Sequence, residues 1–249
     1  MTTTATTALS VHGLVRRYGG NAAVDQVDVT VESHQITALV GPNGAGKTTL
    51  FHCIAGIEPA DAGRVTLAGK DISDLAPHRR VRAGLAWTFQ RVEVFATMTV
   101  AENITVGAEQ RRSTNHDTDD LVNTLIARLG LDDVRDTTTG ELPTGTLRLV
   151  ELGRALATAP SVLLLDEPAG GLDDAQILAF AKLLPQLVEE GMAVVLIEHD
   201  MDLVARIADQ IYVMDRGRVI AHGSLAQLRQ DARVRELFPD SPFATATRT

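Results

Sequence analysis

The sequence predicts an α/β fold with a parallel β-sheet core and an antiparallel β part at its N-terminus. Three short apolar runs are separated by segments of helical periodicity, and they occupy residues 36–40, 162–165 and 192–197. Continuous apolar strands that alternate with helices are typical of a parallel sheet covered on both faces. In residues 8–35, by contrast, apolar and polar residues alternate, which indicates short antiparallel strands joined by a hairpin-like turn.

Composition and charge limit the classes of function. The chain has 249 residues, 45% of them apolar, which is enough for one large domain or two lobes with an ample core. A net charge of −9 argues against nucleic acid as a partner, and the single cysteine, Cys53, excludes a disulfide within the chain and favours a reducing compartment. No apolar run approaches the ~18 residues that span a bilayer, so work at a membrane would require a partner. Residues 1–7 and 241–249 are expected to form flexible tails.

A glycine-rich segment follows the first buried strand and precedes an amphipathic run at residues 50–56. The spacing Gly41–x4–Gly46–Lys47–Thr48 is the P-loop pattern, in which glycine allows several backbone N–H groups to point at one phosphate. Lys47 is expected to reach the β- and γ-phosphates, and the Thr48 hydroxyl to ligate Mg²⁺. The predicted nucleotide-binding residues of this segment are Gly41, Pro42, Asn43, Gly44, Ala45, Gly46, Lys47, Thr48 and Thr49.

The elements after the P-loop helix are expected in the following order. A turn and a second hairpin occupy residues 58–72, and residues 77–84 form a basic helical run whose charges face solvent. Residues 84–90 predict a strand that ends in the polar residue Gln90.

Helices dominate the prediction for the middle of the chain. Thr99 and Glu102 have the spacing of a capping box and start a helix. Residues 111–120 are polar and predict a loop, whereas apolar residues recur at helical spacing in 121–129, where Gly130 is expected to cap the helix. A turn then leads into the next helix.

The last third of the chain is predicted from the same patterns. Residues 173–190 predict a helix that Pro185 should kink or split, because proline cannot donate a backbone hydrogen bond. A helix at residues 201–210, a strand, turn and strand at 211–223, and short helices up to residue 238 complete the chain.

Polar side chains follow the ends of the buried strands. Asp166 and Glu167 end one strand: Asp166 is a candidate Mg²⁺ ligand, and Glu167 is the candidate general base for a water that attacks the γ-phosphate. His199 ends the next strand, where it is placed to contact the γ-phosphate and that water, and Gln90 is placed to reach Mg²⁺ or water. Open α/β sheets bind ligands beyond the carboxyl ends of their strands, so we expect these residues to share one site.

Taken in order, these motifs make the chain resemble the ATP-binding subunit of ABC transporters. Tyr18 resembles the adenine-stacking aromatic of that family, residues 41–49 resemble Walker A, and Gln90 resembles the Q-loop glutamine. The matches that follow in the chain are Asp166 and Glu167 for Walker B, residues 170–173 with Asp173 for the D-loop, and His199 for the switch histidine.

The resemblance covers residues 8–238 and implies a single ABC ATP-binding domain with a P-loop NTPase (RecA-like) core at about 8–90 and 158–238 and an α-helical lobe at about 91–157. It implies that two such ATPase subunits, identical or different, sandwich two ATP molecules, each P-loop being completed by the signature motif of the other subunit. The lobe would dock onto transmembrane permease subunits, which in turn meet a solute-binding protein. The implied location is peripheral, on the cytoplasmic face of the cell membrane.

The signature motif departs from the family pattern LSGGQ, because residues 142–146 are LPTGT. Pro143 replaces the serine whose hydroxyl and backbone N–H would meet the γ-phosphate, and proline has no N–H. Thr144 still offers a hydroxyl, Gly145 keeps the close-approach glycine and its backbone donor, and Thr146 replaces the glutamine. We therefore expect ATP hydrolysis at the site of this chain's own P-loop and an altered contribution to the facing site.

Several segments resemble the ATP-binding subunits of branched-chain amino acid importers; they are residues 16–27, 88–108, 163–173 and 196–223. The ATPases of urea or short-amide importers and of lipopolysaccharide export are similar and remain alternatives. A soluble ABC ATPase of translation or DNA repair is disfavoured by the single P-loop, the lack of a large insertion and the negative charge. Because such an ATPase does not touch the transported solute, the sequence leaves the cargo open.

Overall fold

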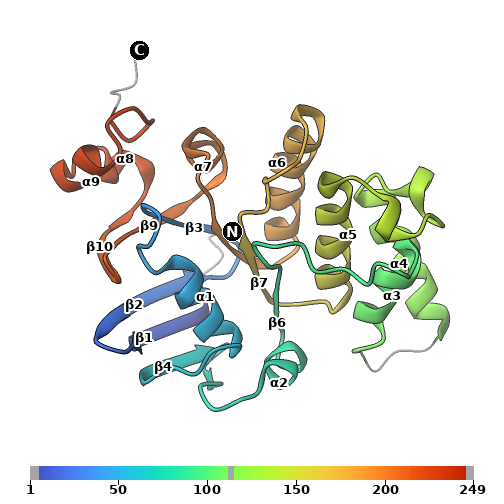
Figure 1. The fold of residues 1–249 in the computed structure, drawn as a ribbon, viewed down its shortest axis with the longest axis horizontal. Coiled ribbons are helices and arrows are strands. Elements are labelled where there is room, and N and C mark those ends of the chain that lie inside the picture. The colour runs from blue at the N-terminus through green and yellow to red at the C-terminus, as the bar shows by residue number, and fades with distance from the viewer. Residues whose placement is uncertain (1–5, 112–114, 245–249) are drawn as a thin grey trace.

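A six-stranded sheet lies at the centre of the computed structural model, which describes residues 6–111 and 115–244 (Figure 1). Its strand order is β10-β9-β3-β8-β7-β6, and its five neighbouring strands from β9 to β6 are parallel while β10 is antiparallel to β9. The strands are β3 (Ile36–Val40), β6 (Leu85–Trp87), β7 (Val162–Asp166), β8 (Ala193–Ile197), β9 (Gln210–Asp215) and β10 (Arg218–Gly223). The predicted parallel core is confirmed.

A second sheet is antiparallel, as the alternating N-terminal pattern predicts. Its order is β2-β1-β4-β5, formed by β1 (Thr7–Tyr18), β2 (Asn21–Glu32), β4 (Ala62–Leu67) and β5 (Lys70–Asp71). The first two strands are twelve residues each and therefore longer than the short strands that we expected.

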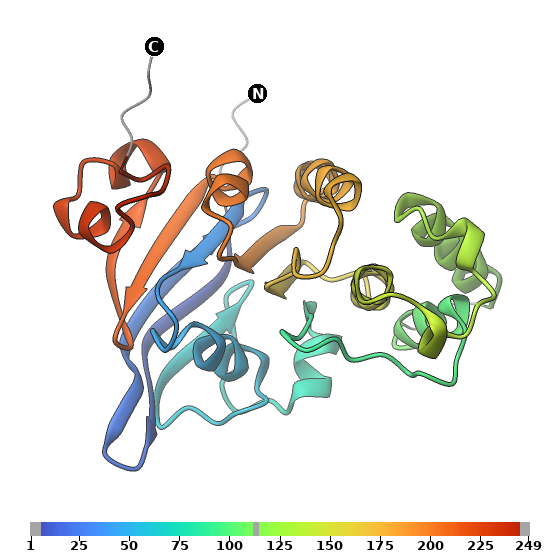
Figure 2. The same ribbon diagram turned by 45° about the horizontal axis from the view of Figure 1, so that its top comes forward.

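The P-loop helix α1 (Lys47–Ala55) packs between the two sheets (Figure 2). Its Leu50, Phe51 and Ile54 join one buried cluster with Leu14 of β1 and Val195 of β8. The parallel sheet is thus covered on this face by one helix and the antiparallel sheet.

The opposite face of the parallel sheet is covered by the helices α5 (Thr144–Ala157), α6 (Asp174–Glu189) and α7 (Met201–Ile207). Helices α3 (Val100–Ala108) and α4 (Asn115–Arg128) pack against α5 and against each other. Helices α3, α4 and α5 form a lobe on the side of β6 (Figure 1). The short helices are α2 (Pro77–Arg82), α8 (Leu225–Leu228), α9 (Ala232–Leu237), η1 (Asp132–Val134) and η2 (Thr139–Glu141).

Local signals at helix ends are confirmed at two positions. The Thr99 hydroxyl accepts a hydrogen bond from Glu102 N, and the Glu102 carboxylate accepts one from Thr99 N, so the predicted capping box starts α3. Gly130, with φ of +66°, follows the end of α4 as expected of a helix cap.

One prediction about helices is wrong, and of the two outcomes predicted for Pro185, a kink or a split, the split does not occur. Helix α4 begins at Asn115, so the predicted loop at 111–120 is helical from that residue on, while residues 112–114 lie outside the described part of the chain. Pro185 does not split α6, which is assigned as one helix from Asp174 to Glu189. The buried Leu184 and Leu187 flank Pro185 in a core cluster, and this burial offsets the hydrogen bond that proline removes.

The predicted tails are also shorter than expected where the structure describes them. Thr7 belongs to β1 and pairs with Glu32 of β2. Phe243 is fully buried, and the centre of its ring lies 5.3 Å from that of Phe238. Phe243 belongs to the hydrophobic cluster that also contains Val234 of α9 and against which Phe238 packs, and this burial holds the chain in place as far as Phe243. Residues 1–5 and 245–249 lie outside the described part.

Arg80 corrects the prediction that the basic run at 77–84 faces solvent. This side chain is 4% exposed, and its guanidinium donates hydrogen bonds to the carbonyls of Cys53, Ile54, Ser73 and Leu75 at 2.6–2.9 Å. Two of these carbonyls belong to the last turn of α1, where a helix has no internal donors left. Arg80 therefore acts as a side-chain cap for the P-loop helix.

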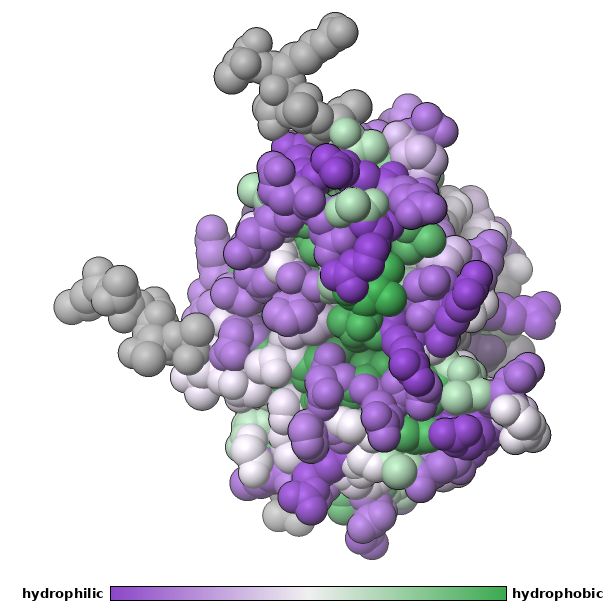
Figure 3. Space-filling model, turned by 90° about the vertical axis from the view of Figure 1, so that its left-hand side faces the viewer, coloured by the Kyte–Doolittle hydropathy of each residue, from purple (hydrophilic) through white to green (hydrophobic). Residues whose placement is uncertain are grey.

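The face that carries α8, α9 and the edge of β10 is mainly hydrophilic, with a narrow band of hydrophobic residues between polar neighbours (Figure 3). A groove of about 510 Å³ runs here between β2 and β10, lined by Asp25, Gln26, Asp28, Thr30, Tyr212, Arg218, Val219 and His222. Among the described residues, no helix combines the length and the apolar character that crossing a bilayer requires.

Replacing Arg80 by alanine should lower the free energy of unfolding by about 2–4 kcal/mol, because four carbonyls lose the guanidinium donor and two of these bonds, to Cys53 and Ile54, are buried. Urea denaturation followed by circular dichroism measures this loss. Arg79→Ala on the same helix is the matched control, since Arg79 is exposed, and should change stability by less than about 0.5 kcal/mol. Equal losses in both variants would contradict the capping role of Arg80.

Candidate nucleotide site

The P-loop lines a hollow of about 420 Å³ beyond the carboxyl ends of the parallel strands. Its lining residues are Ala23, Asn43, Gly44, Ala45, Gly46, Lys47, Thr48, Thr49, Gln90, Glu167 and His199. Helix α1 begins in this hollow with Gly46 as its N-cap and no side-chain cap, so no side chain occupies the N–H groups of its first turn. A helix N-terminus without a side-chain cap is suited to an anion such as a phosphate.

Two glycines of the P-loop are required by close backbone contacts. Gly46 has φ of +99°, and a Cβ on it would lie 2.0 Å from the carbonyl oxygen of Ala23 in β2. Gly41 has φ of +156°, and a Cβ on it would lie 2.2 Å from the carbonyl oxygen of Met214 in β9. The loop is therefore held by strands from both sheets, and neither position has room for a side chain.

Lys47 is folded back onto its own loop. Its Nζ donates hydrogen bonds to the carbonyls of Gly41 at 2.7 Å and Pro42 at 3.1 Å, and the residue is 6% exposed. Burial lowers the pKa of Lys47, while the neighbouring charges of Glu167 and Asp166 raise it. Lys47 is thus positioned at the loop as a charged donor that a phosphate could engage.

Asp166 and Thr48 fit a magnesium ion. Asp166 is 2% exposed, its Oδ1 has no hydrogen-bond partner, and burial raises its pKa while a hydrogen bond with Thr48 lowers it. A buried carboxylate oxygen without a partner beside a hydroxyl matches the oxygen ligands of Mg²⁺, which is held by few protein ligands together with phosphate oxygens and water. Glu167 and Gln90 lie in the same hollow.

The predicted acid-base residues come together at Glu167. The Glu167 Oε1 accepts a hydrogen bond from Gln90 Nε2 at 2.9 Å and lies 2.7 Å from His199 Nε2. Gln90 reaches this point from three residues beyond β6, which ends at Trp87 rather than at Gln90 as predicted. Gln90, Glu167 and His199 follow the strands β6, β7 and β8, and their side chains meet at the Glu167 carboxylate. A carboxylate and an imidazole in contact can accept and donate protons.

The backbone of Glu167 is strained, and its neighbours hold it in place. Glu167 has φ of +49°, a left-handed conformation that costs a residue with a side chain about 1 kcal/mol or more. Its N–H donates to the carbonyl of Ile197 at 3.0 Å, which extends the pairing of β7 with β8 by one residue. The strain therefore lies at the turn that directs the carboxylate into the hollow.

Glu198 is a residue of this site that the sequence analysis missed. Its carboxylate, 4% exposed, accepts hydrogen bonds from Ala169 N at 2.9 Å and His199 N at 3.1 Å, and burial raises its pKa. Glu198 thereby ties the loop after Glu167 to the loop that carries His199. The sequence feature that could have pointed to Glu198 is its position directly after a fully apolar strand and directly before His199.

Tyr18 lies outside the P-loop hollow. The residue is 46% exposed at the tip of the β1–β2 hairpin, its hydroxyl donates to Glu58, and the Arg16 guanidinium lies 4.7 Å from its ring centroid. Asn21, which pairs with Tyr18, is two residues from Ala23 in the lining of the hollow. Tyr18 is therefore held at the tip of the hairpin by side chains that the sequence analysis did not single out.

The predicted signature residues also lie outside this hollow. Pro143 is the N-cap of α5 and gives it no side-chain cap, Thr144 is exposed, and a Cβ on Gly145 would lie 2.6 Å from the Gly171 carbonyl. Position 145 thus requires glycine because a Cβ would collide with the loop at Gly171 of the same chain. The sequence alone does not show this contact. Asp173 caps α6 by accepting from Gln176 N at 2.8 Å.

Glu151 of α5 was missed as well. This carboxylate, 1% exposed, accepts hydrogen bonds from Phe89 N at 3.3 Å and Glu93 N at 3.2 Å, on both sides of Gln90. Burial raises the pKa of Glu151 to about 7, although the two N–H donors and nearby arginines oppose this shift. Its signal was weak, because acidic residues at helical spacing are common on exposed helix faces.

Fold and site together define a P-loop ATPase, and comparisons with known proteins place it in a family. The model of the ABC transporter family matches residues 24–170. The lipopolysaccharide export system ATP-binding protein LptB of Escherichia coli (strain K12) is 32% identical over 243 residues, which cover 94% of this chain and 98% of LptB. The high-affinity branched-chain amino acid transport ATP-binding protein LivG of the same strain is 35% identical over 242 residues, covering 91% and 95%.

A solved structure of the ADP conformation of an ATP-binding cassette of an ABC transporter superposes with a TM-score of 0.82 at 30% identity, covering 96% of this chain and all of that one. The chain belongs to the ABC transporter family and is an ATP-hydrolysing, nucleotide-binding subunit. Subunits of this family function as dimers with transmembrane permease partners.

The stability of the protein should depend on the titration of Glu151. Its folded pKa of about 7 exceeds its ordinary value of 4.5, so the folded chain binds the proton more tightly. The stability from this group is full below about pH 4.5 and is lost as the pH rises through about 7.

Urea denaturation at pH 5 and pH 7.5 tests this dependence. Between these values the wild type should lose about 2 kcal/mol relative to Glu151→Gln, in which an oxygen acceptor for Phe89 N and Glu93 N remains but the titration is gone. Parallel pH dependences for the two proteins would show that Glu151 does not titrate in this range.

Proposed function

We propose that this chain binds ATP with Mg²⁺ and hydrolyses it to power an ABC importer of branched-chain amino acids. The observation that carries the ATPase role is the convergence of Gln90 and His199 on Glu167, in the hollow that Lys47 also lines. The similarity to LivG over 91% of the chain, together with the four importer-like segments, supports the cargo.

In the proposed reaction, backbone N–H groups of residues 43–49 and the Lys47 ammonium bind the phosphates of ATP. Thr48, Asp166 and Gln90 would hold Mg²⁺, which neutralises charge on the β- and γ-phosphates when it is bound. Glu167 takes a proton from the attacking water as general base, and His199 and Gln90 orient that water and the γ-phosphate. Tyr18 stacks on the adenine from the tip of the β1–β2 hairpin.

The second half of each ATP site would come from a second ATPase subunit, identical or different. Thr144, Gly145 and Asp173 lie away from their own P-loop hollow, which supports their use by the nucleotide of the facing subunit. In this proposal residues 8–238 form one ABC ATP-binding domain, with its core at about 8–90 and 158–238.

The permease subunits would dock at the helical lobe, residues 91–157. A groove of about 260 Å³ lies where this lobe meets β6, and its apolar lining includes Trp87, Phe89 and Phe95, the last of which is 45% exposed. Exposed aromatic side chains are favoured at protein interfaces. The chain would then work on the cytoplasmic face of the membrane, meeting a solute-binding protein only through the permease.

Lipopolysaccharide export is a second candidate, favoured by the 32% identity to LptB over 94% of this chain. Urea or amide import is a further alternative. Purification in mild detergent with identification of the associated proteins decides among them: permeases with a solute-binding protein for amino acids support the proposal. Lipid-export components would replace it with the second candidate, and ribosomes or DNA would refute transport altogether.

The proposed general base is tested by Glu167→Gln. This variant should bind ATP with a dissociation constant within about twofold of wild type but hydrolyse it at least about 100-fold more slowly, because the amide cannot accept the water's proton. Phosphate release and equilibrium ATP binding measure the two effects. Glu189→Gln, an exposed carboxamide substitution on α6, serves as control, and near-normal turnover in Glu167→Gln would remove Glu167 from this role.

Restoring serine at position 143 tests the trans geometry. Pro143→Ser adds a backbone N–H and a hydroxyl at the start of α5, outside its own P-loop hollow. ATP turnover should change in the assembled dimer, while ATP affinity of the isolated subunit stays the same. A changed affinity in the isolated subunit would contradict the placement of this motif in the facing site.

A further inference from the structure

The backbone that carries Gln90 has left the sheet and is held by α5. The last hydrogen bond to the neighbouring strand joins Thr88 N to Leu164 O at 2.9 Å. Beyond it, Glu151 accepts from Phe89 N and Glu93 N, and Arg148, one turn earlier on α5, donates to carbonyls of the same segment. Arg154 of the same helix donates to Glu93 O, so three side chains of α5 replace the sheet partner of this segment.

Arg148 binds two segments of the site at once. Its guanidinium donates from Nη1 to Phe89 O at 3.1 Å and from Nη2 to Gln90 O at 2.7 Å. Its Nε donates to Gly170 O at 2.8 Å, in the loop that follows Glu167. A planar guanidinium offers donors in fixed directions, so these three bonds set the position of one loop relative to the other.

These bonds complete a closed ring through the reacting carboxylate. Arg148 holds the Gln90 backbone, the Gln90 side chain donates to Glu167 Oε1 at 2.9 Å, and Gly170 N donates to Glu167 O at 3.2 Å. Gly170 O accepts from Arg148 and closes the ring. The distance between Gln90 and Glu167 is therefore constrained in two ways: by the direct contact of their side chains, and by the hydrogen bonds that connect their backbones through Arg148 and Gly170.

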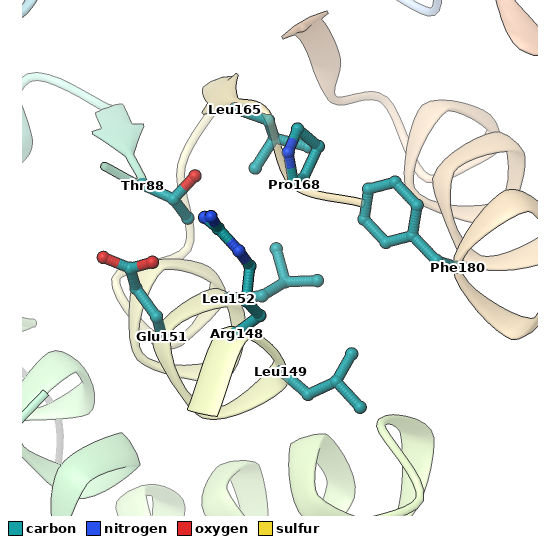
Figure 4. Close-up of a pocket in the computed structure, with 8 residues that line it drawn as sticks. All are labelled: Thr88, Arg148, Leu149, Glu151, Leu152, Leu165, Pro168 and Phe180. Carbon is teal, nitrogen blue, oxygen red and sulfur yellow. The ribbon is translucent and has the colours of Figure 1, made fainter. Parts of the chain in front are cut away.

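The packing around Arg148 restricts its conformation. The side chain of Arg148 rises from α5 toward Thr88 and the segment that carries Leu165 and Pro168 (Figure 4). Only about 10 Å³ of space remains in this pocket, and the buried Thr88 hydroxyl beside it has no partner among the described residues. That space is roughly the size of one water, so the guanidinium has little room to move further toward Thr88.

We propose that Arg148 is a positioning residue for ATP hydrolysis: its guanidinium holds the backbones of Gln90 and Gly170 in the arrangement that lets Gln90 meet Glu167. This inference rests on the proposed function, and it adds a residue that does not itself line the nucleotide hollow and that contacts Gln90, a predicted metal ligand, only at its backbone carbonyl. Arg148 follows Thr144 by one helical turn, so the same bonds link the first turn of α5 to its own chain's hydrolytic residues. If the nucleotide of a facing subunit binds to the first turn of α5 and shifts it, Arg148 would transmit this shift to the backbones of Gln90 and Gly170, and so to the contact between Gln90 and Glu167.

The experiment compares Arg148→Met and Arg148→Lys with wild type as full-length chain in the assembled dimer. Both variants should lower kcat by about tenfold or more while the dissociation constant for ATP stays within about twofold, because the phosphate-binding loop is unchanged. Lysine should not rescue kcat, since a single ammonium group cannot donate to Phe89 O, Gln90 O and Gly170 O in the directions that the planar guanidinium provides. Full activity of Arg148→Lys would overturn the proposal.

Arg128→Met is the matched control for removing an arginine from the helical lobe. Arg128 joins α4 to Glu190 at the end of α6 by two contacts of 2.8–2.9 Å, and it touches no member of the ring. Its kcat should equal that of wild type. A loss of kcat as large as that of Arg148→Met would show that removing any arginine from the helical lobe lowers turnover, and that the bonds of Arg148 are not the cause.

A double-mutant cycle with Gln90→Ala separates positioning from general destabilisation. If Arg148 acts through Gln90, Arg148→Met should change kcat by less than about threefold in the Gln90→Ala background. Losses that multiply in the double variant would overturn this assignment.

Hydrogen exchange without nucleotide tests the ring independently of hydrolysis. The peptide that covers residues 88–95 should exchange faster in Arg148→Met than in wild type or Arg128→Met, because the backbone at Phe89 and Gln90 loses the bonds that Arg148 makes to it, although those of Glu151 and Arg154 remain. Unchanged exchange would refute the proposal. If wild type itself does not hydrolyse ATP, the proposed function fails, and the exchange result alone decides whether Arg148 holds this segment.

Discussion

The parallel pairing of β7 with β8 is the constraint on which the candidate site depends. Asp166 is paired with Ile197, so the residues that follow both strands emerge at the same edge of the sheet. Glu167 continues this pairing by donating to Ile197 O, and the turn that results has a left-handed backbone. The contact between Glu167 and His199 is therefore a consequence of strand register, with Glu198 holding the two loops together.

A second constraint is the close approach of the two sheets around the P-loop. The loop is pressed between the Ala23 carbonyl of β2 and the Met214 carbonyl of β9, and only glycine fits at Gly46 and Gly41. Arg80 caps the other end of α1, so the helix that presents its N-terminus to phosphate is anchored at both ends. Binding by backbone N–H groups demands this rigidity, because such donors cannot adjust by changing rotamer.

The similarity of this chain to known transporter ATPases is compatible with more than one cargo. The chain is similar both to LptB and to LivG, at 32% and 35% identity, although these proteins serve lipopolysaccharide export and amino acid transport. Residues that bind ATP face the same chemical task in both systems, so these residues do not distinguish one cargo from the other. The groove beside Trp87 and Phe95 is where differences between systems would be expressed, since it would meet the permease.

The sequence by itself determined the parallel core, the P-loop and the residues at the strand ends, because strand periodicity and motif spacing are local properties that survive without tertiary information. It could not place Arg80, Arg148 or Phe243, whose partners are distant in the chain or lie on other elements. An arginine on a helix has the same local pattern whether it faces water or buried carbonyls. Only the tertiary structure decided these cases, because it alone brings the acceptors and the packing partners to the side chain.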